Sequence, residues 1–302
     1  MNSALTTNFW LLANTISILA VLILSPTANS QERSDEVGAD TVRVMLERDF
    51  GYELDISGGG GRTIDEPMLL QSTSYDDALH TQMLVLRGLG IGRGVFWRIL
   101  GTELIATGLG KIHRKKIETK KVGEKNVVTQ VENYYFAFNG NLRDQIGNIS
   151  PFIVFTDSTA PFKFPYEISW LHYDSFKDYE PQQPGLGYSL AYSAPGIIAT
   201  IYVYPAGGRK PDHRSEIQDA IEEIIYVHGE GEISHDWGIA EKDGGSTFSF
   251  LPKSDKDKIS TIYVKEYNKK FIKVRMTATD GHYMRDVIQD CLDEIVRLTR
   301  LQ

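Results

Sequence analysis

The 302-residue chain contains a single cysteine, Cys291, which excludes an internal disulfide and any zinc site built from several cysteines. It also lacks the short signatures of common catalytic sites, since no GxSxG, SxxK or HExxH sequence occurs. Net positive charge is missing as well: the formal charge is −8, which disfavours a nucleic-acid partner. What remains is a composition typical of globular proteins, with 41% hydrophobic and 24% charged residues.

Charged side chains are also absent from residues 1–30, and residues 9–24 are mostly apolar. This apolar run is shorter than the roughly 20 residues needed to span a bilayer and is typical of a signal peptide. Ala28 and Ser30 offer small side chains at the two positions that signal peptidases read. We therefore predict a signal peptide over residues 1–30 and a periplasmic or secreted mature protein. The alternative is a protein anchored in the membrane by residues 9–24.

Four consecutive glycines at 58–61 lie in a polar stretch that follows the predicted cleavage site, and glycine disfavours ordered structure. Residues 31–66 are therefore expected to be a flexible N-terminal segment. Residues 67–155 have the alternation and turn signals of a first α+β unit. Its predicted elements are a strand at 68–71, a helix from Ser74 to Gly88 or Gly90, a strand at 95–105, and a hairpin of strands 112–122 and 127–139.

Residues 156–187 form a connector rich in proline and aromatic residues, which we expect to be covered rather than free. Residues 188–302 have the clearer pattern of a second α+β unit. It combines several strands of alternating polarity, a helix that begins near Pro211 and ends at Gly229, and an amphipathic helix after Asp280. This order of elements predicts an α+β fold of two units, each a mostly antiparallel sheet covered by one or two helices.

Two short sequences and the closing elements of the second unit resemble the PsbP-like fold. The sequences are residues 187–190 (GYSL) and 200–203 (TIYV), and the last hairpin and helix follow them. The resemblance covers about residues 186–302, includes no catalytic motif, and implies binding or assistance in assembly. The first half resembles segments of uncharacterised exported bacterial proteins through residues 84–90 (LVLRGLG) and 134–136 (YYF), which implies no activity.

A basic stretch in the first hairpin is one candidate binding surface. His113, Arg114, Lys115 and Lys116 lie within it, in an otherwise acidic chain. On a strand, His113 and Lys115 would point to one face, and Arg114 and Lys116 to the other. Such a face suits an anionic membrane surface or an acidic partner. The alternative is an exposed hairpin whose lysines prevent pairing with another sheet edge.

The aromatic connector is the second candidate surface, through Trp170, His172 and Tyr173. Flat rings that carry a polar group are suited to recognising a sugar or a peptide. The alternative is that these rings form the core between the two units. The lone Cys291 lies on the apolar face of the closing helix and is predicted to be a buried, unreactive thiol.

A run of glycines and a group of potential metal ligands are each interpreted as having no functional role. The alternating glycines Gly88, Gly90, Gly92 and Gly94 follow a predicted helix, whereas a phosphate-binding loop precedes one, so we expect a turn. Side chains suited to metal binding gather within residues 228–236 but match no standard zinc spacing, so we expect a solvated loop. No metal, cofactor or catalytic residue is predicted.

These observations favour a non-catalytic exported binding or envelope-assembly protein. Its expected partner is an envelope protein or an anionic surface, with no nucleic acid and no disulfide-linked partner. The alternative is a hydrolase whose site is assembled between the two units from residues distant in the sequence. An enzyme requires a pocket with convergent polar groups, whereas a binding module requires an exposed patch.

Overall fold

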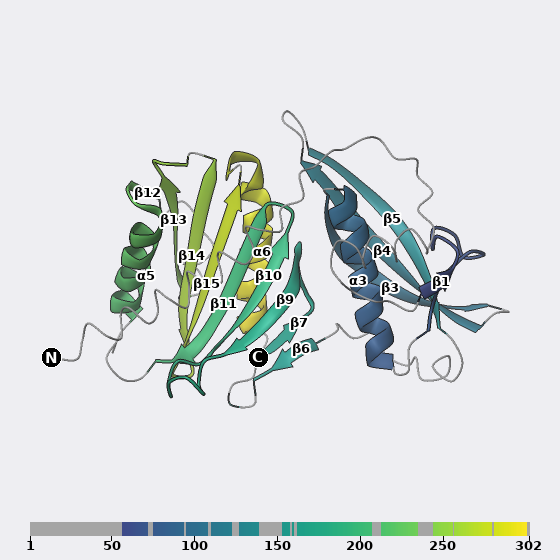
Figure 1. The fold of residues 1–302 in the computed structure, drawn as a ribbon, viewed down its shortest axis with the longest axis horizontal. Helices are drawn as coiled ribbons and strands as arrows, with labels where there is room; N and C mark the ends of the chain where they lie inside the picture. Colours follow the sequence, from purple (N-terminus) through teal and green to yellow (C-terminus); the bar gives the residue numbers. More distant parts are fainter. Residues whose placement is uncertain are drawn as a thin grey trace.

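A computed structural model describes most of the chain from Ile56 onward. The described residues are 56–71, 75–93, 95–107, 110–122, 127–138, 153–157, 159, 162–206, 213–234, 244–255, 257–279 and 281–300. The predicted signal peptide lies outside these ranges, as does most of the expected flexible segment. Among the described helices, none is both long and apolar enough to cross a membrane. Figure 1 shows two units, each built on its own sheet.

The first unit is a five-stranded sheet with one helix packed on it. Its elements are β1 (Ile56–Gly58), β2 (Met68–Leu70), α3 (Tyr75–Arg93), β3 (Phe96–Thr107), β4 (Gly110–Val122) and β5 (Val127–Phe138). The strand order is β1-β2-β5-β4-β3, and all neighbours are antiparallel except β2 and β5. Leu84 and Val85 of α3 share a buried core with Trp97 and Phe136 of the sheet. The predicted hairpin is confirmed as β4 and β5.

The helix of the first unit is longer than predicted. α3 continues to Arg93, so Gly88, Gly90 and Gly92 lie in a helix rather than in the expected turn. Glycine in a helix costs about 1 kcal/mol relative to alanine. Gly88 is buried, so packing within the unit outweighs the local preference of the sequence.

The glycine run at 58–61 belongs to the connection between β1 and β2. Gly58 and Gly61 have positive φ angles of 87° and 69°, which glycine adopts without strain. The Gly61 N–H donates to the carbonyl of Glu66 at 3.0 Å, and the Gly61 carbonyl accepts from the Tyr135 N–H at 2.7 Å. Residues 56–66 therefore form β1 and an ordered connection to β2, although a flexible segment is expected there from the sequence.

The second unit is an eight-stranded antiparallel sheet with a helix on each face. In spatial order its strands are β12 (Gly231–Ser234), β13 (Ser246–Pro252), β14 (Lys258–Tyr267), β15 (Lys270–Thr279), β11 (Ile197–Pro205), β10 (Tyr188–Ala194), β9 (Leu171–Asp178) and β8 (Glu167–Ile168). Its helices are α5 (His213–His228) and α6 (Gly281–Arg300). The predicted α+β class with mostly antiparallel sheets is confirmed.

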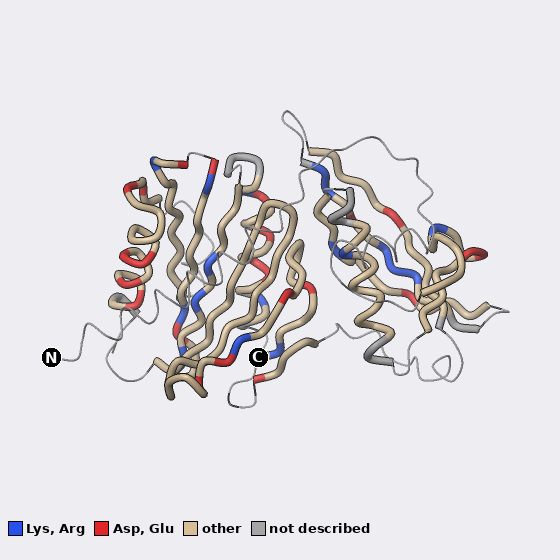
Figure 2. Tube along the Cα trace, in the orientation of Figure 1, with Lys and Arg blue, Asp and Glu red and all other residues tan. Residues whose placement is uncertain are grey.

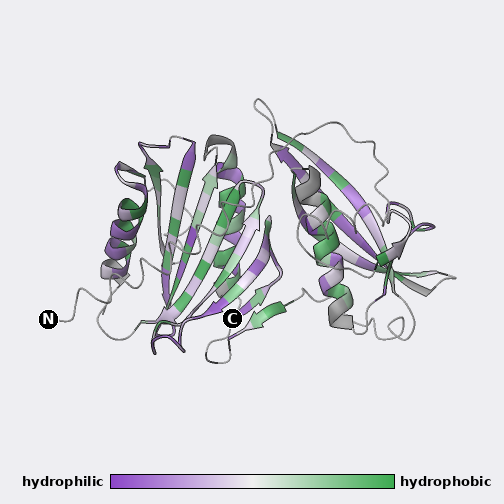
Figure 3. Cartoon of the chain, in the orientation of Figure 1, coloured by the Kyte–Doolittle hydropathy of each residue, from purple (hydrophilic) through white to green (hydrophobic). Residues whose placement is uncertain are grey.

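Side chains of this sheet alternate between two cores on opposite faces. Tyr202 and Tyr204 of β11 lie in the core under α5, whereas Ile201 and Val203 lie in the core under α6. Figure 3 shows the alternation of hydrophobic and hydrophilic residues along the strands. Cys291 on α6 is fully buried, as predicted, and burial raises the pKa of its thiol to about 12.

The aromatic connector is part of the second unit. Its residues form β7 (Lys163–Pro165), β8 and β9, and β7 pairs in a two-stranded ribbon with β6 (Ile153–Thr156), which directly precedes the connector. Phe162 and Phe164 at the ribbon are buried in the core under α6. The expectation that the rings of this segment are covered is confirmed for most of them, but Phe176 is 39% exposed.

A buried ion pair holds α5 on the sheet. Lys273 Nζ of β15 lies 3.0 Å from Glu223 Oε2 and 3.5 Å from Glu216 Oε1, and both carboxylates belong to α5. Tyr204 of β11 donates its hydroxyl hydrogen to Glu216. Lys273 and Glu216 are almost fully buried, so each charge needs an opposite charge close by.

Candidate functional site

The two units meet along the edge of the first sheet. β3 is the last of its described strands, so the outward N–H groups of β3 have no strand partner there. The Ile99 N–H instead donates to Glu167 Oε1 of β8, at 2.9 Å. Beside this bond, the ring of Trp97 stacks on His172 of β9, with 3.8 Å between ring centroids. We refer to Trp97, Ile99, Lys115, Glu167 and His172 as the junction.

The structure places the predicted aromatic surface inside the molecule. Trp170 and His172 are 1% and 2% exposed, and Tyr173 is partly buried against the cores of both units. Buried rings present no area to a sugar or a peptide, so the prediction of a recognition surface is corrected for Trp170 and His172. Their position matches the alternative, in which the rings form the core between the units.

Trp170 is held by groups from both units. Its indole N–H donates to Asp290 Oδ2 of α6 at 2.8 Å. From the first unit, the Arg98 guanidinium lies 4.3 Å and the Lys120 ammonium 4.8 Å from the centroid of the indole ring. Such cation–π contacts contribute about 0.5–2 kcal/mol each. Trp170 therefore links β3 and β4 to α6.

Strand alternation divides the predicted basic surface in two. His113 and Lys115 are buried on the face of β4 that packs toward α3 and the junction; Gln82 Nε2 of α3 lies 3.3 Å from His113 Nδ1. Arg114 is half-buried and forms an ion pair with Glu103, and Lys116 is exposed. Of the four residues, His113 and Lys115 are therefore removed from the candidate surface, and Arg114 and Lys116 remain on it.

Burial changes the proton affinity of the groups around the junction. It raises the pKa of Glu167 to about 8 and lowers the pKa of Lys115, which attracts Glu167 electrostatically, to about 8. Burial and the charge of Lys115 lower the pKa of His113 to about 4. Burial and the charge of Arg87 lower the pKa of His172 well below its usual value. Both imidazoles are therefore neutral at neutral pH.

Glu167 and His172 keep unused hydrogen-bonding capacity. Glu167 Oε2 and His172 Nε2 lie 3.8 Å apart, and neither atom has a hydrogen-bond partner within the described part of the chain. With the ammonium of Lys115 nearby, the group combines side chains that enzymes use for proton transfer. The junction therefore contains side chains that could transfer protons. They could do so only if a substrate can reach them.

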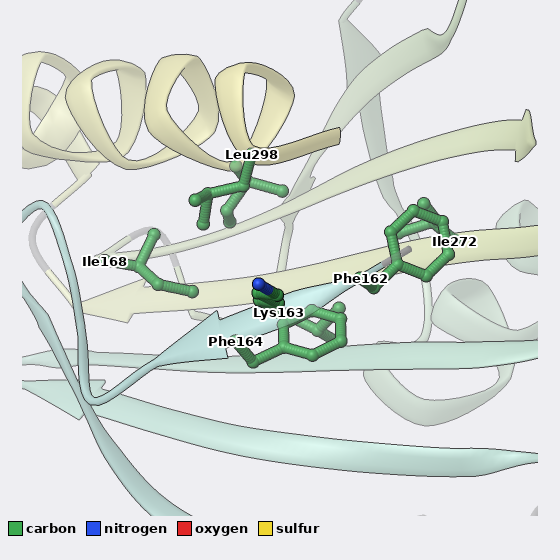
Figure 4. Close-up of a pocket in the computed structure, with 8 residues that line it drawn as sticks. Phe162, Lys163, Phe164, Ile168, Ile272 and Leu298 are labelled. Carbon is green, nitrogen blue, oxygen red and sulfur yellow. The ribbon is translucent and has the colours of Figure 1, made fainter. Parts of the chain in front are cut away.

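A hollow in the described part of the chain lies away from the junction. It is a crevice between β7 and α6, lined mostly by apolar side chains that include Phe164, Ile168, Ile272 and Leu298 (Figure 4). Its volume is about 10 Å³, about what a single water molecule requires. None of the titratable groups of the junction lines it. The described residues also contain no group of three His, Cys, Asp or Glu side chains placed to hold a metal ion.

A second contact fastens the units beside the junction. Arg87 of α3 donates to the carbonyl of Tyr173 at 3.0 Å and to Ser193 Oγ at 3.2 Å. The same guanidinium forms an ion pair with Asp174. Because the planar guanidinium offers several donors, one side chain binds both β9 and β10.

The predicted basic surface and the predicted aromatic surface thus meet in the structure. His113 and Lys115 of the first, and Trp170 and His172 of the second, all lie at or beside the junction. Comparison with known protein families and with curated proteins finds no match for this chain. The PsbP-like resemblance therefore stays a prediction.

Glu167, Arg87 and Arg98 connect the units but are not predicted from the sequence. Each finds its partner far along the chain, so local spacing contains no trace of the contact. For Glu167 one signal exists: it is an acidic residue between Tyr166 and Ile168, in a segment expected to be covered. A carboxylate in such a place requires a donor.

Proposed function

We propose that this chain is an exported, non-catalytic binding or envelope-assembly protein. The junction holds the two units together, and the outer face of β3, β4 and β5 binds an anionic surface. Export rests on the signal-peptide pattern of residues 1–30, which stays a prediction. The weak PsbP-like resemblance of the second unit is consistent with a role in binding or assembly.

The charge of β4 is the observation that carries this proposal. By strand alternation its outer face carries three basic residues, Arg114, Lys116 and Lys120, and one acidic residue, Glu118, in a chain whose formal charge is −8. Figure 2 shows basic residues recurring along it. The core under α3 lies on the opposite face, and the exposed Lys116 shares its face with Val131, which is 52% exposed. Lysine beside exposed apolar side chains suits an anionic surface with an apolar layer beneath, as in a lipid membrane.

A hydrolase with its site between the units is the second candidate. Its support is the convergence of Glu167, Lys115 and His172, with shifted pKa values, at the junction. These groups are largely buried, so a substrate would reach them only after the units had separated. A binding role needs no such separation, and the structure therefore supports it better.

Reversing the charge of Lys116 is expected to weaken binding to anionic vesicles. A lysine near such a surface contributes about 1 kcal/mol, so Lys116→Glu should weaken association at least about fivefold. The measurement is co-sedimentation with vesicles that contain phosphatidylglycerol, at low and at physiological salt. Higher salt should weaken binding of the wild type, because it screens exposed charges.

Lys163→Glu is the matched control, since it reverses an exposed lysine on β7 of the second unit. It should bind vesicles like the wild type. A wild-type protein that does not bind anionic vesicles would remove the proposed surface. So would an equal loss of binding in the two variants, because the effect would then be one of net charge alone.

A further inference from the structure

Two buried polar atoms face each other at the junction, and neither has a hydrogen-bond partner within the described part of the chain. They are Glu167 Oε2 and His172 Nε2, which lie 3.8 Å apart. The other polar atoms of the two side chains are engaged. Glu167 Oε1 accepts from the Ile99 N–H. The His172 ring has a hydrogen bond with the backbone of Trp97 that favours the charged ring, as a bond donated to a carbonyl does.

These bonds fix the tautomer of His172. Because Nε2 makes no bond, the ring N–H that donates to Trp97 is on Nδ1, and Nε2 of the neutral ring is an acceptor. An ionised carboxylate is also only an acceptor. Ionised Glu167 would therefore place two buried acceptors opposite each other without a donor, which is costly. One proton on Glu167 Oε2 removes the conflict, since a small rotation brings the carboxyl O–H within about 3 Å of Nε2.

The surroundings of the pair favour a proton on Glu167 rather than on His172. Charged side chains act on the two residues from four other elements: Lys115 of β4, Arg98 of β3, Glu294 of α6 and Arg87 of α3. Burial and the charge of Arg87 both disfavour an imidazolium at His172. Lys115 and Arg98 attract an ionised Glu167, but the effect of burial is larger and raises the pKa of Glu167 to about 8. The pair is therefore a neutral carboxyl group beside a neutral imidazole.

The first unit imposes this requirement on the pair. Glu167 and His172 lie opposite each other in the pairing of β8 with β9, so they stay neighbours when the units separate. Within the junction, Trp97 of β3 accepts the only ring N–H of the neutral His172 and stacks on its ring. Without β3, this N–H would be available to an ionised Glu167, and water would reach the carboxylate. Association of the units and protonation of Glu167 are therefore coupled.

We infer that Glu167 binds a proton when the two units associate and releases it when they separate, so that mildly alkaline pH loosens the junction. In the associated protein the carboxyl O–H of Glu167 donates to His172 Nε2. On separation the O–H bond breaks, the proton passes to solvent, and the carboxylate is hydrated. The inference rests on the junction and not on the proposed membrane surface, so a failed vesicle experiment would not affect it.

The pH window follows from the directions of the pKa shifts. The pKa of Glu167 rises from its ordinary 4.5 to about 8, so its contribution to association is lost as the pH rises toward 8. The pKa of Lys115 falls from 10.5 to about 8, and its opposite contribution therefore changes only above pH 8. The lowered pKa values of His113 and His172 have an effect only below their ordinary value of 6.5. Between pH 6.5 and 8, the effect of Glu167 is therefore isolated.

Infrared spectroscopy of the full chain tests whether Glu167 holds the proton. The wild type should show the band of a protonated carboxyl group at pH 6.5, and the band should titrate with a midpoint near 8. Glu167→Gln should lack it. Glu103→Gln, which removes an exposed carboxylate from the same sheet, is the matched control and should keep it. A wild-type protein with no carboxyl band at pH 6.5 overturns the inference, and this result needs no variant. A band that persists in Glu167→Gln overturns it as well.

Hydrogen exchange tests the coupling of this proton to the junction. The protection of the Ile99 amide, relative to an unstructured peptide at the same pH, should fall about tenfold from pH 6.5 to 8 in the wild type and in Glu103→Gln. It should stay constant in Glu167→Gln, because the amide accepts from Ile99, donates to His172 and does not titrate. Protection that is constant in the wild type overturns the inference. So does an equal fall in the wild type and in Glu167→Gln.

Discussion

Replacing Trp170 with alanine is expected to lower the free energy of unfolding by about 4 kcal/mol, the cost typical of a buried tryptophan. The indole is buried in the core under α6, so truncation leaves a cavity. It also removes the hydrogen bond to Asp290 and the contacts of Arg98 and Lys120. Because two of these contacts come from the first unit, the loss should weaken the association of the units as well. Urea unfolding followed by circular dichroism measures the change.

Trp170→Phe is the matched control for this prediction. It keeps most of the apolar volume and loses the indole N–H, so we expect a cost of about 1–2 kcal/mol. Two separate unfolding transitions in Trp170→Ala would support the link between the units. An alanine variant as stable as the wild type would show that the ring is not a core residue, and the aromatic segment would again be a candidate recognition surface.

The second large loss in the free energy of unfolding is expected when Lys273 is replaced. Lys273→Met removes the ammonium that lies between two carboxylates of α5 and leaves Glu216 almost fully buried without it. Breaking a buried ion pair by removing one partner costs about 3–5 kcal/mol. We therefore expect a loss of this size in the free energy of unfolding, again measured by urea unfolding.

A double variant separates the effect of charge from that of packing. In Glu216→Gln/Lys273→Met the neutral amide no longer needs the ammonium, so at least about half of the lost stability should return. If the single and the double variant were equally unstable, the ion pair would not be the cause of the loss. The position of Lys273 in the core would then have to be explained by packing.

Local sequence patterns, such as alternating polarity, turn residues and helical periodicity, correctly predicted much of the second unit. Alternating polarity and the turn at Asn268 correctly predicted β14 and β15, and Asn268 and Lys269 have positive φ, as a tight hairpin requires. The apolar stripe of α6 has the helical period and was predicted along with the burial of Cys291. Such patterns are local, so one sequence is enough to recognise them.

Contacts between distant segments could not be predicted in this way. Alternation showed that His113 and Lys115 share a face, but the burial of that face depends on α3 and on the second unit. The hydrogen bond from Ile99 to Glu167 joins two strand edges from different sheets. Gly88 continues a helix because its surroundings are packed, against its own propensity. Tertiary context decided each of these points.

Hydrogen exchange at the Ile99 amide tests the junction most directly. This N–H lies on the edge strand β3 and donates to Glu167 across the two units. We predict that it is protected in the wild type and that Glu167→Ala speeds its exchange about tenfold, as expected for the loss of a hydrogen bond worth about 1.4 kcal/mol. The amide of Val274, in the middle of the second sheet, should keep its rate. An Ile99 amide that exchanges in the wild type as fast as in an unstructured peptide would contradict the account, because the units would then not be joined across this edge.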